Sequence, residues 1–369
     1  MKITTNKVTF DEPLYCESGR ILQPFEVVYE TYGELNEDRS NVIIITHALT
    51  GSHHAAGVYE GESKAGWWDG FIGDGKAIDT TKYFVICMNN IGSCFGSTSP
   101  LSPHPLDGKP YRFRFPVLTI SDIVKAQIRV MKYLEINSVY AVVGGSLGGM
   151  QALCYAVEYP KFAKHIIMIA STAYTRPWAI AYNKVTTEAI RNDPDFKDGY
   201  YDPADIKENG LKGLAVGRMA GHISFLSPQS MDRKFGRRYV GQDGLYELFG
   251  RFEVERYMEY NGYNFPHKFD PLSYLYIVKT MNIFNASRGS DTLEQSLSTI
   301  KSNLHLISFS GDLLFRPVEM EEIYETMKNI GKSDIVTYKM IESDYGHDAF
   351  LVEIDKFDDY VKDILQENI

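Results

Sequence analysis

The chain alternates short apolar runs with longer segments whose apolar residues recur at helical spacing. Short runs rich in β-branched and aromatic residues are typical of strands that are buried on both faces of a parallel sheet. Six such runs predict strands: VIIIT (42–46), YFVICM (83–88), VYAVV (139–143), HIIMIA (165–170), LHLISFS (304–310) and IVTYKM (335–340).

Helical patterns lie between several of these runs. One helix is predicted to begin at the capping pair Ser121–Asp122, because apolar residues then follow at spacings of three to four. Another is predicted over residues 149–159, directly after a glycine-rich turn and ending at Pro160. Alternating strands and helices predict an α/β fold with a largely parallel sheet and helices on both faces.

The stretch from about residue 174 to 289 has a different character. It is rich in Tyr, Arg, Met and Phe, has helix-like stretches and lacks a clear buried strand. We therefore predict an α/β core formed by residues 1–173 and 290–369, interrupted by a helical lid insertion at 174–289.

Charge and composition exclude several classes of protein. The 369 residues carry a formal net charge of −10, so no overall cationic field would attract nucleic acid or an anionic membrane. The N-terminus lacks the apolar region of a signal peptide, and no apolar run is long enough to span a bilayer. Four widely spaced cysteines without a CxxC motif favour a reduced, cytoplasmic protein.

The stretch VVGGSLGGMQ (142–151) carries the most specific chemical signal. Gly144, Ser146 and Gly148 satisfy G-x-S-x-G, with a predicted strand before them and a predicted helix after them. A nucleophile on such a tight turn sits in strained backbone, and close neighbouring chains leave room only for glycine beside it. We therefore predict that Ser146 is a catalytic nucleophile.

A serine hydroxyl needs a base and an orienting acid, which in this kind of fold follow in the order Ser, Asp or Glu, His. His347 lies in the polar loop SDYGHDAFL, after the last predicted strand, whereas His305 lies within a strand and is expected to be structural. Asp312 follows the strand LHLISFS and is the predicted acid. Asp355 and Glu342 are weaker candidates for that role.

The oxyanion of an acyl-transfer intermediate requires backbone donors. The N–H of Leu147, directly after the nucleophile, is one candidate, and Leu49 in the loop THALTGSHHAAG is the other. That loop also holds His47, His53 and His54, but no carboxylate lies at a useful spacing in the sequence, so no metal site is predicted.

Taken together, these segments resemble the homoserine O-acetyltransferase family of the α/β-hydrolase superfamily over nearly the whole chain. The motifs that carry the resemblance occur in the family's order: YETYGELN, HALTGSHHAAG, GWWDGFIGDGKAIDT, VVGGSLGGMQAL, GLAVGRMAGHISFLS, SGDLLFRP and YGHDAFL. The resemblance implies an α/β-hydrolase fold and transfer of an acetyl group from acetyl-CoA to L-homoserine through an acyl-serine, toward methionine. It also implies no tightly bound cofactor.

Further roles rest on the resemblance alone. It implies that Arg218, in GLAVGRMAGH, and Asp348, next to His347, bind the amino-acid acceptor, whose zwitterionic form needs one cation and one carboxylate. It also suggests a homodimer formed through the lid, where residues 281–284 (MNIF) are expected to supply an apolar patch. The sequence departs from the family at Ser93 and Ser99, where glycine is frequent, which leaves acyl or acceptor specificity open.

Other activities remain open at this point. Succinyl-CoA would be an alternative donor, although no Lys or Arg occurs from Thr46 to Gly61 and the nearest is Lys64, which favours acetyl. Serine is an alternative acceptor, and a serine hydrolase would use the same triad with water. A catalytically inactive interaction module is disfavoured because no triad member is missing.

One cationic cluster has two interpretations. The stretch DRKFGRR (232–238) lies in the insertion and carries four cations. A solvated helix face is the favoured interpretation, and a contact for the phosphates of coenzyme A is the functional alternative.

Overall fold

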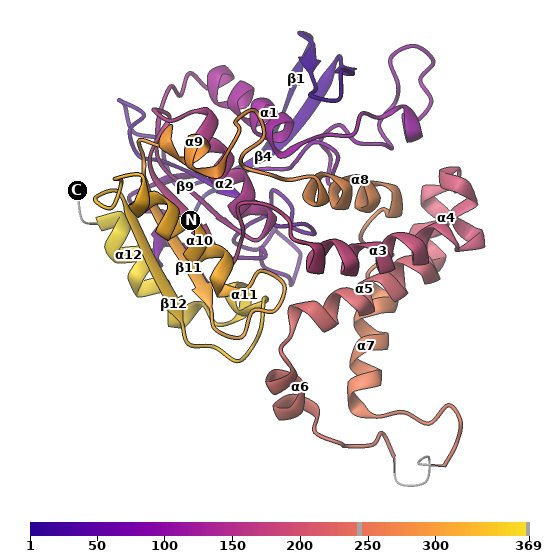
Figure 1. Cartoon of the computed structure of the whole chain (residues 1–369). Coiled ribbons are helices and arrows are strands. Elements are labelled where there is room, and N and C mark those ends of the chain that lie inside the picture. The colour runs from indigo at the N-terminus through magenta and orange to yellow at the C-terminus, as the bar shows by residue number, and fades with distance from the viewer. Residues whose placement is uncertain (242–245, 367–369) are drawn as a thin grey trace.

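The computed structural model describes residues 1–241 and 246–366, and its centre is a twisted sheet of eight strands (Figure 1). The first two strands of the sheet order pair antiparallel with their neighbours, and the other six run parallel. In spatial order the strands are β1 (Ile3–Phe10), β4 (Phe25–Tyr32), β8 (Phe84–Met88), β5 (Val42–Thr46), β9 (Val139–Gly145), β10 (Ala163–Ile169), β11 (Asn303–Phe309) and β12 (Val336–Ile341).

The six predicted strands are all present, and none of their ends is displaced by more than two residues. The sequence reading missed the antiparallel pair β1 and β4. It also placed the first helix cap wrongly: the cap of α1 (Ile120–Tyr133) is Thr119, whose hydroxyl accepts from the amide of Asp122 while Asp122 accepts from the amide of Thr119. This reciprocal capping box fixes the start of the helix.

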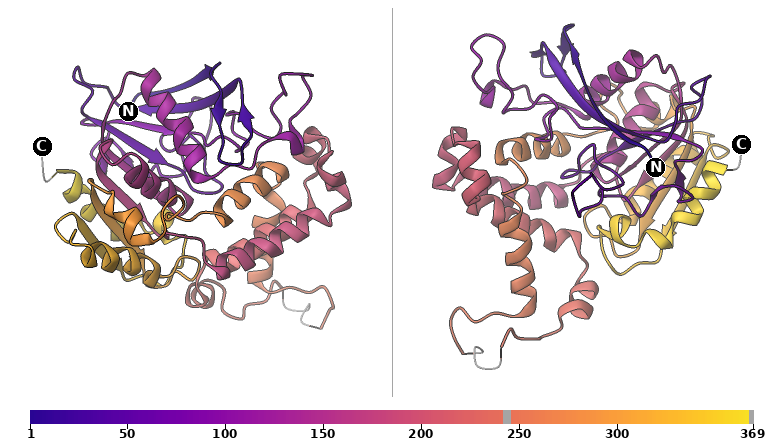
Figure 2. Two further views of the ribbon diagram at one scale, coloured as in Figure 1. Left: turned by 45° about the horizontal axis from the view of Figure 1, so that its top comes forward. Right: turned by 180° about the vertical axis from the view of Figure 1, so that it is seen from behind.

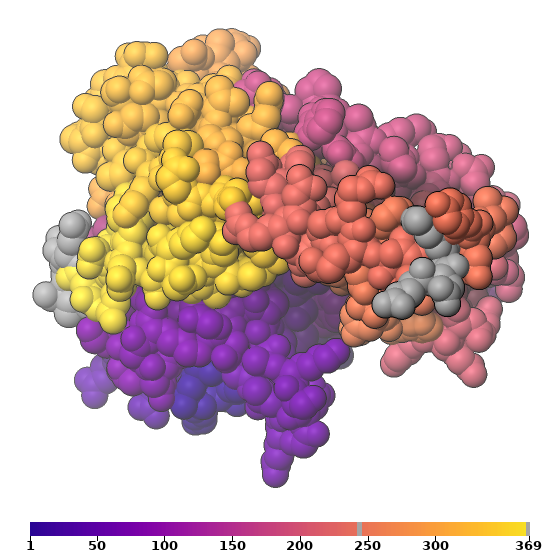
Figure 3. Space-filling view, turned by 90° about the horizontal axis from the view of Figure 1, so that it is seen from below, coloured from indigo at the N-terminus to yellow at the C-terminus, as the bar shows by residue number. Residues whose placement is uncertain are grey.

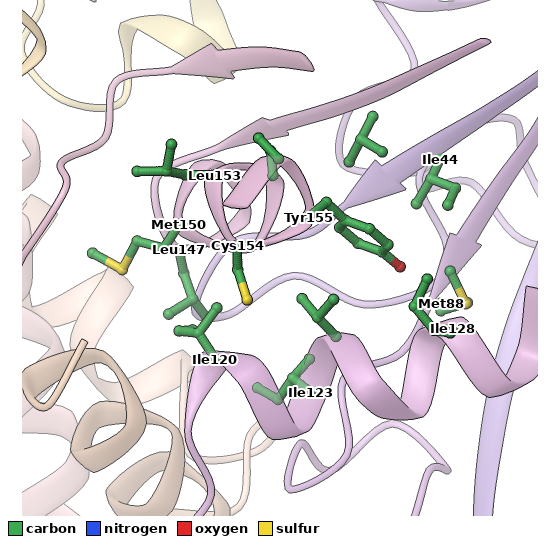
Figure 4. Close-up of a cluster of buried hydrophobic side chains, with 14 of the residues drawn as sticks. Ile44, Met88, Ile120, Ile123, Ile128, Leu147, Met150, Leu153, Cys154 and Tyr155 are labelled. Carbon is green, nitrogen blue, oxygen red and sulfur yellow. The ribbon is translucent and has the colours of Figure 1, made fainter. Parts of the chain in front are cut away.

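Helices cover both faces of the sheet (Figure 2), as the predicted fold class requires. One face packs against α1, α2 (Leu147–Glu158), α9 (Leu293–Ser298) and α10 (Pro317–Asn329). Figure 4 shows this core, in which Ile120 and Ile123 of α1 meet Leu147 and Cys154 of α2. The other face packs against the C-terminal elements α11 (Ala349–Val352), η3 (Ile354–Lys356) and α12 (Asp358–Gln366).

Between β10 and β11 the chain leaves the sheet and forms a separate group of helices (Figure 1). These are α3 (Pro177–Arg191), η2 (Pro194–Gly199), α4 (Pro203–Asn209), α5 (Lys212–Phe225), α6 (Pro228–Phe235), α7 (Glu253–Asn264) and α8 (Pro271–Asn282). Where the chain leaves and re-enters the core, the two segments run antiparallel and are joined by hydrogen bonds that the amides of Thr175 and Ala286 donate. A small apolar core of its own, including Leu214, Phe269 and Tyr274, holds these helices together.

The remaining elements are short. Residues between the strands form two two-stranded sheets and one turn of 3₁₀ helix: β2 (Leu14–Tyr15) with β3 (Ile21–Leu22), β6 (Ile72–Gly73) with β7 (Ile78–Asp79), and η1 (Arg112–Arg114). In the described part of the chain, none of the helices combines the length and the apolar character that crossing a bilayer would need.

Candidate active site

Ser146 lies on the turn between β9 and α2, with backbone angles φ 58° and ψ −123°. A positive φ is uncommon for a residue with a side chain and persists only where the surroundings fix it. Here the amide of Ser146 donates to Ile169 O at 2.9 Å, and the hydroxyl of Ser171 donates to Ser146 O at 2.7 Å. The strained turn therefore holds the side chain of Ser146 at the N-terminus of α2.

The glycines around Ser146 are required by the neighbouring strand β5. A Cβ on Gly148 would lie 2.0 Å from the carbonyl oxygen of Thr46, and one on Gly144 would lie 2.1 Å from the hydroxyl of the same residue. Both atoms belong to Thr46, the last residue of the central strand β5, so they have little freedom to move aside. The close approach of β5 to the turn thus explains the G-x-S-x-G pattern.

The structure brings Ser146, His347 and Asp312 together from three separate segments. Nε2 of His347 lies 2.9 Å from Oγ of Ser146, and its Nδ1 lies 2.7 Å from Oδ2 of Asp312. The other oxygen of Asp312 accepts the amides of Leu314 and Phe315, which fixes the carboxylate. The arrangement is that of a nucleophile, a base and an orienting acid.

The two rival acids lie elsewhere. Asp355 belongs to the 3₁₀ helix η3, and Glu342 is exposed to solvent. Within the described chain neither of them contacts His347.

The electrostatics at His347 favour a base that is able to hold a proton. Burial works against the charged imidazole, but the charge of Asp312, its hydrogen bond and the nearby charge of Asp348 outweigh burial. The pKa of His347 is therefore raised above its ordinary value. A buried imidazole with a raised pKa can accept a proton from Ser146 and return it within the same cycle.

Two backbone amides remain available as donors beside Ser146. In the portion of the chain that the structure describes, the N–H groups of Leu49 and Leu147 donate to no protein acceptor. Leu147 is the first residue of α2, and Leu49 lies in the wall of the pocket that Ser146 also lines. The first N–H groups of a helix also favour a developing negative charge.

Sequence reasoning missed the role that His47 plays in the loop that carries Leu49. Burial lowers the pKa of His47 to about 4, so its ring is neutral at physiological pH. Its Nδ1 bonds to Ala48 O at 2.8 Å, and its Nε2 accepts the amide of Asn90 at 3.0 Å. The imidazole therefore ties the loop to the end of β8 in one tautomer.

A buried carboxylate stabilises the far end of the same loop. Glu30 of β4 is fully buried and accepts hydrogen bonds from Tyr32 at 2.6 Å, from His54 Nδ1 at 3.0 Å and from Tyr59. The hydroxyl of Tyr32 in turn accepts the amide of Ala55 at 2.7 Å. The sequence spacing did not reveal this carboxylate partner, because Glu30 lies far from the loop histidines in sequence and next to them in space.

The described residues contain no cluster of three or more His, Cys, Asp or Glu side chains that could hold a metal ion. Their four cysteines are all free thiols. Burial raises the pKa of Cys94 to about 12, which leaves this thiol a poor competitor to Ser146 as a nucleophile.

A pocket with an empty volume of about 700 Å³, its mouth included, opens in front of the three side chains. Arg218 of α5 and Asp348 both line it, with Ser146 and His347. Tyr182 and Tyr274, which the sequence did not single out, complete its wall on the side of the inserted helices.

Arg218 and Asp348 face this pocket as unpaired charges. The guanidinium of Arg218 lies 5.3 Å from the ring centroid of Phe225 and 4.7 Å from that of Phe265. Across residues 1–241 and 246–366, neither Arg218 nor Asp348 has an ion-pair partner. Burial raises the pKa of Asp348, and the charges of His347 and Arg218 offset this effect in part.

One expectation about the inserted helices is wrong, and a second agrees with the structure. Met281 and Phe284 are 3% and 8% exposed, so residues 281–284 form no surface patch, contrary to expectation. They pack into the main core instead, where α8 meets the sheet. The four cations of residues 232–238 are exposed to solvent.

Comparisons with known proteins agree with this geometry. Residues 41–353 match the family described as the alpha/beta hydrolase fold. The homoserine O-acetyltransferase of Sulfurimonas autotrophica is 61% identical over 99% of both chains, and that of Nautilia profundicola is 60% identical over the whole of both.

Two solved structures are similar over nearly their full length. The homoserine O-acetyltransferase of Bacillus anthracis superposes with a TM-score of 0.92 at 30% identity, covering 99% of this chain and 98% of that one. Esterase E22 superposes with a TM-score of 0.89 at 27% identity, covering 99% and 100%. The same scaffold thus occurs in proteins named as transferases and as esterases.

Proposed function

The chain belongs to the homoserine O-acetyltransferases of the alpha/beta hydrolase fold, and from this premise we propose how its residues carry out the reaction. Acetyl-CoA donates the acetyl group, L-homoserine accepts it on its hydroxyl, and Ser146 carries it between the two. The product serves methionine biosynthesis, which follows from the family's activity.

In the first half-reaction His347 takes the proton of Ser146 while Oγ attacks the thioester carbonyl. The amides of Leu49 and Leu147 stabilise the oxyanion, since both point their N–H groups to no protein acceptor. As the intermediate collapses, the carbon–sulfur bond breaks and the thiolate of coenzyme A takes the proton from His347. Asp312 holds the imidazole in orientation throughout.

In the second half-reaction homoserine occupies the pocket. Arg218 binds its carboxylate and Asp348 its ammonium, so that its hydroxyl faces the acyl-serine. His347 removes the hydroxyl proton, the oxygen attacks the acetyl carbonyl, and the ester to Ser146 breaks with return of the proton to the serine. The enzyme is regenerated and O-acetylhomoserine leaves.

The single observation that carries the transferase assignment is the pair of unpaired charges at the pocket wall. A positive and a negative side chain without ion-pair partners match a zwitterion, whereas water needs neither of them. A serine hydrolase remains the second candidate, because esterase E22 shares the scaffold. Thiol release from acetyl-CoA should be slow alone and strongly accelerated by homoserine; equal rates with and without homoserine would indicate a hydrolase.

The pocket also favours acetyl over succinyl as the acyl group. Among the residues that line it, Arg218 is the one permanent cation, and the acceptor's carboxylate engages it. A succinyl group would bring a second carboxylate with no cation of its own. Intact mass after brief exposure to acetyl-CoA and, separately, to succinyl-CoA should show an adduct of acetyl size alone, and serine should replace homoserine poorly as the acceptor.

The inserted helices provide one wall of the pocket and, in this proposal, the lid of residues 174–289 over a core of residues 1–173 and 290–369. They also offer a surface for a homodimer. Tyr246, Leu248 and Phe249 are 97%, 88% and 91% exposed, an unusual density of apolar side chains in solvent. Sedimentation should show a dimer that Leu248→Asp or Phe249→Asp weakens. The substrates place the enzyme in the cytoplasm, and no tightly bound cofactor takes part.

A further inference from the structure

A second pocket lies at the junction of the core and the inserted helices. It is lined by the segment after β8 (Cys94, Phe95 and Leu101), by α4 and by the turn between α7 and α8. Figure 3 shows a recess between the purple part of the core and the orange helices of the insertion. The pocket is open to solvent, and its empty volume is about 940 Å³.

Lysines without carboxylate partners gather at this pocket. Lys207 and Lys268 line it and are exposed, and neither forms an ion pair with any described residue. Lys64, from the loop that follows the Leu49 segment, is near enough for its charge to act on Lys268. Burial and the charge of Lys64 together lower the pKa of Lys268.

The one carboxylate in the wall does not neutralise these cations. Asp270 accepts hydrogen bonds from the hydroxyl of Tyr201 and from the amide of Ser273 at 2.7 Å, where it caps α8. Neighbouring ammonium groups without a counter-ion repel each other. Although the protein carries a net charge of −10, none of the described carboxylates pairs with these lysines, so an anion from solution would stabilise them.

A series of aromatic contacts connects the second pocket with the active-site pocket, although the two have no described lining residue in common. Phe95 and Phe269 meet edge to face with centroids 5.5 Å apart, and Phe269 meets Tyr274 at 5.9 Å. Tyr274 lines the active-site pocket together with Leu49, which packs on the same cluster as Phe95. These rings lie between the two pockets, and a ligand that is anionic at one end and apolar in its middle would pass along them to reach both.

We propose that this second pocket binds the phosphates of the nucleotide end of acyl-CoA, with Lys64 and Lys268 as the principal contacts and Lys207 beside them. The proposal rests on the proposed function, because that function supplies the ligand. Phe95 and Phe269 form an apolar boundary along which the pantetheine arm passes toward Ser146. Lysines bind phosphate as mobile point charges, which suits a ligand that must leave after each turnover.

The other cationic cluster of the chain is less suited to this role. Arg233 forms an ion pair with Asp344, Lys234 lies 4.3 Å from the ring centroid of Tyr257, and Arg237 lies 5.5 Å from that of Phe252. These cations already have partners within the protein. They make a matched control of equal charge.

The test compares two acetyl donors that differ in the nucleotide. Acetyl-CoA carries the phosphates, and S-acetylpantetheine carries the same thioester without them. In Lys64→Ala/Lys268→Ala we expect the KM for acetyl-CoA to rise by roughly tenfold with kcat unchanged, because the loss is one of binding. The kinetic constants with S-acetylpantetheine should stay those of the wild type, and Lys234→Ala/Arg237→Ala should behave as the wild type with both donors.

Calorimetry separates this proposal from the proposed function. Adenosine 3′,5′-bisphosphate should bind the wild type and Ser146→Ala equally and bind the double lysine variant about tenfold more weakly, whatever the acyl acceptor is. Absence of acetyl transfer alongside normal binding would overturn the function and leave the site in place. Three results would overturn the site. They are an unchanged KM for acetyl-CoA in the double lysine variant, an equal rise in KM with acetyl-CoA and S-acetylpantetheine, and binding of inorganic phosphate as tight as that of adenosine 3′,5′-bisphosphate.

Discussion

Nε2 of His347 lies 2.9 Å from the hydroxyl oxygen of Ser146, although 201 positions separate the two residues in sequence. This contact makes Ser146 the expected carrier of the acetyl group. Ser146→Ala should fold normally and show no mass increase after exposure to acetyl-CoA, whereas Cys94→Ala should still gain an acetyl group. An adduct that survives in Ser146→Ala would assign the nucleophile elsewhere.

The contact between Asp312 and His347 predicts both a rate and a pH effect. Asp312→Asn should lower kcat by on the order of 10⁴, as loss of the orienting acid does in comparable triads. The charge of Asp312 raises the pKa of His347 while burial lowers it, so in the variant that pKa should fall. Because the base works in its neutral form, the acidic limb of the residual pH–rate profile should move to lower pH. Asp355→Asn is the control; a limb that stays in place in Asp312→Asn would contradict the assignment.

Arg218 is predicted to act on the acceptor alone. Arg218→Ala should leave the burst of thiol release from acetyl-CoA nearly intact and raise the KM for homoserine between roughly tenfold and a hundredfold, the value of a charged hydrogen bond. Asp348→Asn should act in the same direction. Arg191→Ala, an exposed arginine on α3, serves as the control. Loss of the burst with an unchanged KM for homoserine would move Arg218 to the donor site.

Tyr32 and Glu30 are predicted to hold the loop that carries Leu49. Tyr32→Phe removes a hydroxyl that accepts the Ala55 amide and donates to Glu30, and it leaves both groups buried. The free energy of unfolding should fall by about 1–3 kcal/mol, the cost of an unsatisfied buried polar group. Chemical denaturation measures this loss, and Tyr15→Phe, at an exposed position, should show none.

Gly148 is predicted to tolerate no side chain. A Cβ there would lie 2.0 Å from Thr46 O, so Gly148→Ala should either fail to fold or displace the turn and abolish acylation. Thermal unfolding and intact mass test this together. Gly70→Ala, where the nearest atom is the flexible end of Ile354 at 3.0 Å, should retain both stability and acylation.

Local patterns were sufficient for the parallel strands and for the turn at Ser146, because both follow from contiguous residues. The antiparallel edge was missed for a physical reason: β4 reads FEVVYETY, and its Glu30 looks like a surface charge until Tyr32, His54 and Tyr59 surround it. Such burial depends on residues that are distant in sequence, so the local pattern of apolar and polar residues does not indicate it.

The positions of Asp312 and His347 were predictable because the order of triad members along the chain is restricted. That Arg218 and Asp348 line the same pocket was not predictable from local patterns, since it depends on how α5 packs beside the loop after β12. Tyr182 and Tyr274 show the same limit: as aromatic residues on helices they looked like any others, and only packing places them at the pocket.

The hydrogen-bonded crossing at Thr175 and Ala286 brings the two ends of the insertion together where they meet the core. Because the two ends meet in this way, one helical insertion could be exchanged for another while β10 and β11 stay paired as parallel neighbours. Chimaeras joined there would take Ser146, Asp312 and His347 from one parent and the position of Arg218 from the other. Such an exchange would need two crossovers in the sequence, one near Thr175 and one near Ala286, and would leave Ser146, Asp312 and His347 in place.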